Sequence, residues 1–180
     1  MVRFRPVPDL LLYKHMKMMI FGIVASGKTT LARKLSAALG IPHYEGDCIA
    51  WGFPGDERYK RTPEQQAEII ARLDETGDWI VEGTYRESQK SLFDRADIIV
   101  FLDTPLPVRL CRIVIRFVKQ RLGTEECHYK PTWEMLRLMF KWTWEFEMDR
   151  KKYEIILAGY GKKVFHAHTA NEVLRQEWGK

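Results

Sequence analysis

The chain has little cysteine and no long apolar segment. Its three cysteines, Cys48, Cys111 and Cys127, lie far apart, and no two have the spacing of a metal-binding or redox-active pair. An odd and widely spaced set is typical of a reducing compartment, so we expect a cytoplasmic protein. The longest apolar runs have the length of a strand and fall far short of the roughly 20 residues that cross a bilayer, which predicts no membrane partner.

The N-terminal residues lack the apolar core and the small-residue cleavage site of a secretory signal. Pro6 and Pro8 instead indicate an extension before the fold. A chain of 180 residues suffices for one sizeable core and is short for two comfortable domains. We therefore expect an extension over 1–16 and a single domain over 17–180.

The composition is that of a folded protein with an anionic partner. Hydrophobic residues make up 46% and charged residues 29% of the chain, which excludes a disordered tail. The net charge of +5 favours a nucleotide, a nucleic acid or an acidic metabolite as partner. Because a phosphate-handling enzyme needs cations in any case, we favour a phosphate ligand over nucleic acid.

Short apolar runs alternate with helical spacing along the chain. We expect strands at Met18–Phe21, Ile41–Tyr44, Trp79–Val81, Ile98–Leu102 and Lys163–Ala167. We expect helices at Thr29–Leu39, Pro63–Leu73 (with Thr62 as its N-cap), 105–121, 132–158 and 171–177. This alternation predicts an α/β fold, a three-layer α/β/α sandwich around a five-stranded parallel sheet.

The run Gly22-Ile-Val-Ala-Ser-Gly27-Lys28-Thr29 matches G-x-x-x-x-G-K-[ST], the P-loop or Walker A motif, and stands between an expected strand and an expected helix. Its glycines let successive N–H groups turn toward phosphate oxygens at a helix N-terminus. Lys28 can reach the β- and γ-phosphates, and the Thr29 hydroxyl can bind Mg²⁺. We therefore predict an ATP site, with Mg²⁺, formed by Gly22, Ala25, Ser26, Gly27, Lys28, Thr29 and Thr30.

Three further segments carry a family resemblance: Asp47–Trp51, Trp79–Tyr85 and Val100–Asp103. With the P-loop they resemble the adenylate kinase and nucleoside monophosphate kinase branch of P-loop kinases, which includes shikimate kinases. More narrowly they resemble bacterial kinase-like proteins known as DNA topology modulation proteins. The resemblance spans about residues 17–175. It implies a phosphotransferase with an unidentified small-molecule acceptor and a helical lid over about 112–150.

The resemblance also implies roles for polar residues near the strand ends. Asp47 ends a stretch that is similar to the entry of the monophosphate site, so it is expected to bind the acceptor or the water shell of the metal. Glu82 and Arg86 stand in a run similar to the kinase D-G-x-P-R element, in which the acid orients Mg²⁺ and the arginine grips the acceptor. Thr29 and Glu82 are thus the expected metal ligands. The alternatives are a capping role for Asp47 and solvent-exposed positions for Glu82 and Arg86.

Asp103 follows four apolar residues, a pattern that by itself indicates a Walker B acid. The resemblance gives that place to Glu82, so we expect Asp103 to cap the helix that starts at Pro105.

Arg109, Arg112 and Arg116 are spaced to share one helix face. The stretch from Arg112 to Arg116 resembles the opening of the adenylate kinase lid, so these two are expected to be catalytic. The alternative is a solvated basic face. Arg150 stands where a second lid arginine would return to the site.

The aromatic residues of Pro131–Tyr153 allow two interpretations. Base stacking would suit nucleic-acid binding. Their helical spacing favours a core or a protein interface, and a second apolar face leaves a homodimer open. His166 and His168 point to the same face of the last strand, and without a nearby cysteine we interpret them as packing or base-pocket neighbours and not as zinc ligands.

The function that these signals favour is transfer of the ATP γ-phosphoryl group to a small molecule or nucleotide. One alternative is an ATP-dependent nucleic-acid-binding regulator without small-molecule kinase activity, and another is a nucleotide-binding interaction module with a degenerate acceptor site. A steep salt dependence of DNA affinity would indicate the regulator.

Overall fold

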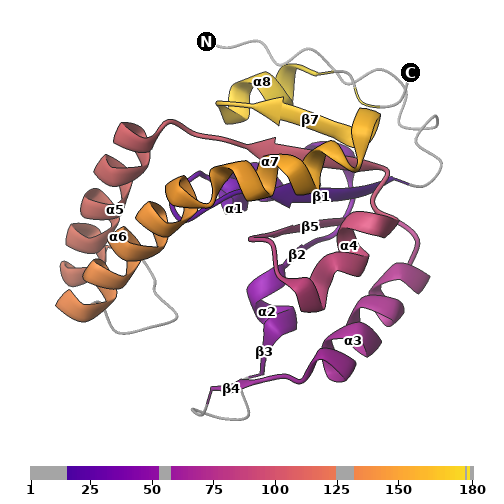
Figure 1. Ribbon diagram of the computed structural model, residues 1–180, viewed down its shortest axis with the longest axis horizontal. Coiled ribbons are helices and arrows are strands. Elements are labelled where there is room, and N and C mark those ends of the chain that lie inside the picture. Colours follow the sequence, from indigo (N-terminus) through magenta and orange to yellow (C-terminus); the bar gives the residue numbers. More distant parts are fainter. Residues whose placement is uncertain (1–15, 53–57, 125–131, 177, 179–180) are drawn as a thin grey trace.

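The structure, a computed structural model, describes residues 16–52, 58–124, 132–176 and 178. A parallel sheet of five strands lies at its centre in the order β2-β5-β1-β6-β7 (Figure 1). The strands are β1 (Lys17–Phe21), β2 (His43–Glu45), β5 (Trp79–Gly83), β6 (Ile98–Leu102) and β7 (Val164–Ala167). The predicted three-layer fold and its five strands are confirmed.

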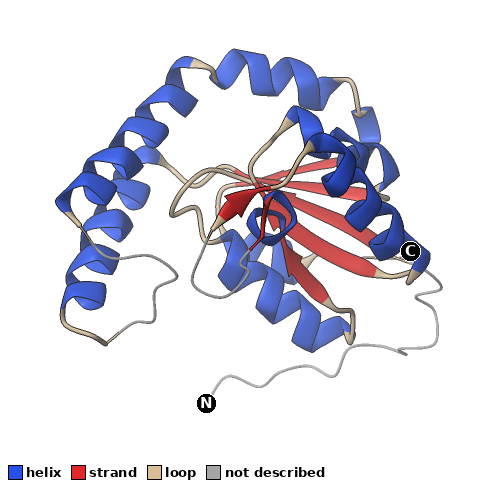
Figure 2. Cartoon of the chain, turned by 90° about the horizontal axis from the view of Figure 1, so that it is seen from below, coloured by secondary structure: helices blue, strands red, loops and turns tan. Residues whose placement is uncertain are grey.

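The sheet is covered on both faces because its central strand alternates apolar side chains between two cores. Met18 and Ile20 pack with residues of α1 (Lys28–Leu39) and α8 (Ala170–Arg175). Met19 and Phe21 pack with residues of the helices on the opposite face. Those helices include α3 (Pro63–Glu75), α4 (Lys90–Arg95) and α7 (Arg150–Ala158). Figure 2 shows the strands enclosed between helices.

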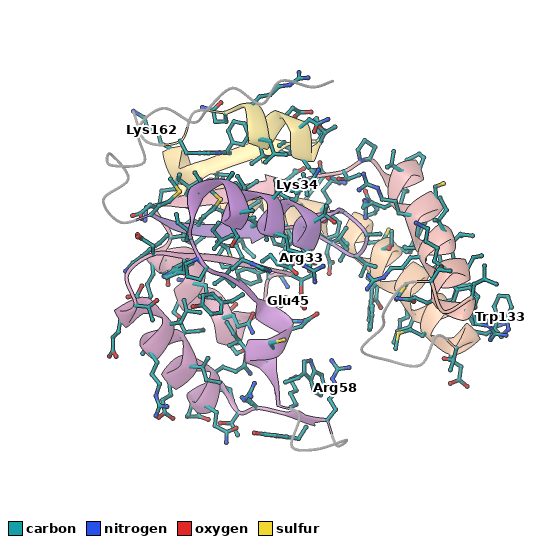
Figure 3. All side chains as sticks on the ribbon, turned by 180° about the vertical axis from the view of Figure 1, so that it is seen from behind. Arg33, Lys34, Glu45, Arg58, Trp133 and Lys162 are labelled. Carbon is teal, nitrogen blue, oxygen red and sulfur yellow. The ribbon has the colours of Figure 1, made fainter. Side chains whose placement is uncertain are left out.

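Two long helices, α5 (Leu106–Arg121) and α6 (Trp133–Met148), form an arm beside the sheet (Figures 1 and 2). Trp133 projects at the outer end of the arm (Figure 3) and is largely exposed, whereas Phe146 at the inner end is buried in the sheet core. The single helix expected over 132–158 is therefore wrong. The chain bends at Asp149, which lets α6 stay against α5 while α7 packs on the sheet.

Several short elements were not predicted, because none is long enough to show a hydrophobic period. They are α2 (Gly46–Ala50), the hairpin of β3 (Trp51–Gly52) and β4 (Tyr59–Lys60), the 3-10 turn η2 (Glu87–Gln89), a second 3-10 turn η3 (Gly161–Lys163), and α4. The second strand begins at His43, later than expected. The preceding Pro42 has no N–H to contribute to a ladder.

The start of the fold also differs from the expected boundary. Met16 is buried, and its carbonyl accepts a hydrogen bond from the Trp79 amide at 3.1 Å, so it belongs with β1 and not with the extension. The rest of that extension lies outside the described residues. The predicted cap of α3 is confirmed, because Thr62 and Gln65 exchange the two hydrogen bonds of a capping box. Within the described ranges, no helix is long and apolar enough to cross a membrane.

Candidate functional site

The loop that joins β1 to α1 has the conformation of an anion cradle. Gly27 has φ 97° and Ala25 has φ 59°, so both lie in the left-handed region, which is uncommon for alanine. A Cβ on Gly22 would approach the Ser26 hydroxyl to 2.7 Å and the Leu102 carbonyl to 3.0 Å, which leaves room for glycine alone. The first turn of α1 carries no acid and no side-chain cap, so its N–H groups are available to an anion.

Two residues at the junction of the loop and α1 are placed to contact a phosphate ligand. The Ser26 hydroxyl is buried and has no hydrogen-bond partner within the described chain. A buried polar atom without a partner is costly unless a ligand satisfies it. Thr30, the third residue of α1, is exposed beside the loop.

Glu82 meets the P-loop because β5 is the direct neighbour of β1 in the sheet. The Thr29 hydroxyl donates a hydrogen bond of 2.6 Å to one Glu82 oxygen, and Lys28 Nζ lies 3.9 Å from the other. Only 6% of Glu82 is exposed. A hydroxyl and a carboxylate side by side at a phosphate loop form the oxygen donor set that Mg²⁺ prefers, so these residues fit the ion.

Helix α5 and the segment before it contact the same loop from the side of β6. Arg112 Nη1 donates to the Ala25 carbonyl at 3.2 Å and to the Ser26 carbonyl at 2.9 Å. The Thr104 hydroxyl also donates to the Ser26 carbonyl, at 2.8 Å. Arg116 lies about one turn further along α5 and is half-buried. Of the two expected lid arginines, Arg112 therefore contacts the loop directly.

Arg109 does not belong to an exposed basic face. Its side chain is fully buried, donates to the Thr104 carbonyl at 2.8 Å and forms an ion pair with Glu147 of α6. Its guanidinium carbon lies 5.7 Å from the centre of the Phe146 ring. The three arginines lie on one helix, as their spacing predicts, but Arg109 lies near the start of α5 and is covered by α6.

Asp47 and Arg86, the two residues expected at the acceptor, form an ion pair although 39 positions separate them in the sequence. Asp47 lies in α2 and its side chain is 67% exposed. Sequence reasoning missed the residue that holds α2 in place. Buried Gln89 donates to the Gly46 carbonyl at 2.8 Å, a contact for which a single glutamine in a short turn gives no sequence signal.

The hairpin next to α2 contributes arginines that sequence reasoning also missed. Arg61 donates to the backbone carbonyls of Cys48, Ile49 and Trp51 and so ties the hairpin to α2. The Arg58 guanidinium lies 4.0 Å from the centre of the Trp51 ring. The two arginines flank β4, which is too short to show a hydrophobic period, so the sequence pattern did not indicate them.

The expected capping role of Asp103 is wrong. Helix α5 has Pro105 at its N-cap position and no side-chain cap. The Asp103 side chain instead shares a sheet face with Phe101, two residues earlier, and accepts a hydrogen bond of 2.7 Å from Arg150 Nη1. Burial alone would raise the pKa of this carboxyl, but the hydrogen bond and charge of Arg150, with a smaller effect of His166, hold it below its ordinary value.

Comparisons with known proteins identify the fold. No protein-family model and no curated protein sequence matches the chain. Shikimate kinase from Acinetobacter baumannii, in complex with shikimate, is similar over 93% of this chain and 96% of its own, with a TM-score of 0.54 and 15% identity. An uncharacterized protein from Eubacterium ventriosum ATCC 27560 is similar over 88% and 92%, with a TM-score of 0.53 and 15% identity.

At this level of identity the likeness shows the fold alone, which is that of kinase-like P-loop proteins. The expected resemblance to P-loop kinases is confirmed at that level. The narrower resemblance to DNA topology modulation proteins stays a prediction.

Proposed function

We propose that the protein is a Mg²⁺-dependent kinase that transfers the γ-phosphoryl group of ATP to a small-molecule acceptor. The observation that carries the proposal is the cluster of Lys28, Thr29 and Glu82 around a loop in P-loop conformation. A lysine, a hydroxyl and a carboxylate in this arrangement serve phosphate and metal binding, and a purely structural turn has no need of them.

In this proposal the loop holds the nucleotide and its ion. Thr29 and Glu82 would hold Mg²⁺, which supplies charge neutralisation at the phosphates. Lys28 Nζ donates at 3.2 Å to the Ile23 carbonyl. Arg112 donates to the carbonyls of Ala25 and Ser26. Phosphate oxygens are stronger acceptors than these carbonyls, so both cations would exchange their loop contacts for the nucleotide.

The arm of α5 and α6 would act as the lid over about 112–150. Closure would bring Arg112 and Arg116 against the transferring group, where charge spreads over the γ-oxygens. It would also exclude water from the phosphoryl group. The acceptor would lie near the Asp47–Arg86 pair, with the carboxylate accepting from an acceptor hydroxyl and the guanidinium binding an acceptor anion.

The proposal is tested by a screen for ADP production with nucleoside monophosphates, nucleosides and small hydroxy metabolites, shikimate among them. An acceptor that stimulates ADP release above the basal rate supports the proposed kinase activity. Stimulation by DNA alone would overturn it in favour of the nucleic-acid-binding regulator.

The nucleotide site has its own test, which needs no acceptor. Lys28→Ala should abolish the rise in melting temperature that ATP produces, because the loop loses its side-chain cation at the γ-phosphate. Lys34→Ala, an exposed position on the same helix (Figure 3), should keep that rise. Undiminished ATP stabilisation in a folded Lys28→Ala variant would contradict the site.

A further inference from the structure

Asp103, His166 and His168 come together at the ends of the two adjacent strands β6 and β7. The strands are in register with Phe101 beside His166, and the Asp103 amide continues the ladder by donating to the Ala167 carbonyl at 2.8 Å. Residues two apart on a strand share a face, so all three side chains project from the same face. One ligand atom from each lies within 4.8 Å of the others.

We propose that these three side chains form a binding site for a zinc-class transition-metal ion. Two imidazoles and a carboxylate are a donor set that suits Zn²⁺, Co²⁺ or Ni²⁺. His166 Nε2 and Asp103 Oδ2 are 3.3 Å apart. Two ligands of a tetrahedral zinc ion, each bound at about 2.0–2.1 Å, are separated by about 3.3 Å, so this pair already has the spacing of one tetrahedral edge.

The third ligand is oriented by the backbone. His168 Nδ1 lies 3.0 Å from the Asp103 carbonyl oxygen, which can only accept, so Nδ1 carries the proton and Nε2 is left with its lone pair. A second-sphere hydrogen bond to a backbone carbonyl is the usual device that fixes the tautomer of a metal-binding histidine. Both imidazoles are exposed, so an ion can reach them from solvent.

This site is chemically distinct from the one proposed for Mg²⁺. Thr29 and Glu82 offer oxygen atoms alone, whereas the strand-end site offers two nitrogen atoms, which Mg²⁺ does not favour. The sequence interpretation set the histidines aside because no cysteine is near them. Their partner is an aspartate 63 positions away from His166, which becomes a neighbour through strand pairing.

Arg150 is the natural competitor of the ion. Its Nη1 bonds the same Asp103 oxygen that faces His166, at 2.7 Å. The guanidinium has a second carboxylate, Glu147, whose oxygens it contacts at 3.0–3.1 Å. Arg150 can therefore release Asp103 to an ion and remain paired. A carboxylate also offers two oxygens, so one oxygen of Asp103 can bind the ion while the other accepts the hydrogen bond from Arg150.

The experiment is a zinc titration of the full chain without nucleotide, by calorimetry and by competition with a chromophoric chelator. The expected result is one tightly bound equivalent, and with Co²⁺ the visible absorption bands of a tetrahedral site. His166→Gln and His168→Gln should each weaken zinc binding about tenfold or more. His43→Gln, on the opposite edge strand β2, should leave it unchanged.

Arg150→Gln gives a test in the opposite direction, because it removes a positive charge that competes for Asp103. It should tighten zinc binding, whereas a metal bound elsewhere on the chain would not respond. Circular dichroism and melting temperature check that each variant is folded. Equal zinc affinity in the wild-type chain and in folded His166→Gln and His168→Gln variants would overturn the proposal, as would the absence of zinc binding to the wild-type chain.

Discussion

Glu82 and Glu45 are neighbours in the register of β5 and β2, yet their surroundings differ. Glu82 is buried and accepts the Thr29 hydrogen bond. Glu45 is partly exposed and its oxygen lies 3.8 Å from Arg33 on α1 (Figure 3). A charge acts more strongly on a nearby ion where water is excluded, so of these two acids Glu82 is the one suited to hold a metal.

Glu82→Gln should abolish the additional ATP stabilisation that Mg²⁺ provides and lower phosphoryl transfer about 100-fold or more, because a neutral amide replaces the carboxylate that we propose binds the metal. Glu45→Gln makes the same chemical change one strand away and should retain both properties within a few-fold. Thermal shifts with and without Mg²⁺ provide the readout. A Mg²⁺ response that survives in Glu82→Gln and is lost in Glu45→Gln would show that the acid was assigned to the wrong strand.

At the scale of elements, α5 combines two uses of arginine. Its buried Arg109 joins it to α6, and its exposed Arg112 reaches the P-loop. The same helix thus belongs both to the support of the arm and to the proposed nucleotide site.

Substituting Arg112 and Arg116 by alanine should lower kcat more than it raises the KM for ATP, because the contacts proposed for them with the transferring group would tighten in the transition state. Lys119→Ala, an exposed position on the same helix, is the matched control and should leave both constants unchanged. The measurement is steady-state kinetics with an acceptor from the screen. Normal turnover in both arginine variants would contradict a catalytic role and would indicate that this face of α5 is a solvated basic surface.

The Arg109–Glu147 pair predicts an effect on stability. Glu147→Ala would leave the fully buried Arg109 guanidinium without its carboxylate, so the free energy of unfolding should fall by about 3–5 kcal/mol. Glu145→Ala removes an exposed partner of Lys141 on the same helix and should cost less than about 1 kcal/mol. Urea unfolding of both variants compares them, and equal losses would refute the interpretation of Arg109 as a buried charge.

At the scale of the whole molecule, Asp74 connects three parts of the sheet face. It accepts hydrogen bonds from Lys17 of β1 at 2.6 Å, from Arg95 of α4 at 2.5 Å and from the Trp79 indole of β5 at 3.3 Å. Burial alone would raise the pKa of its carboxyl, but these hydrogen bonds, led by that of Lys17, hold the pKa below its ordinary value.

This lowered pKa sets the direction of a pH dependence. A carboxylate with a lower pKa in the folded state stabilises the fold above its unfolded pKa of about 3.9, and the contribution is lost as pH falls through the folded pKa. Asp74→Asn should therefore lower the free energy of unfolding at pH 7 by about 1–3 kcal/mol. Below about pH 4 the same substitution should lower it by less, because the wild-type carboxylate is becoming protonated there. Urea unfolding at both pH values measures this. A loss that stays constant with pH would contradict the role of the charge.

Much of the fold follows from signals between residues that are close in sequence. The conformation of the P-loop, the bounds of β6 and the capping of α3 were predicted from the sequence, because each depends on backbone sterics or on hydrogen bonds within a few residues. The same local signals were insufficient for α2 and for the β3–β4 hairpin, which are too short to carry a period.

The partners of the charged residues were decided by the tertiary structure. Glu82 reaches Thr29 across 53 positions because β5 lies beside β1, and Asp103 meets Arg150 and His166 because β7 lies beside β6 and α7 returns over the sheet. The sequence determined a P-loop motif in a parallel α/β fold. Which acid stands at the loop, and which aspartate stands beside two histidines, depends on strand order, and strand order is set by how the whole chain buries its two cores.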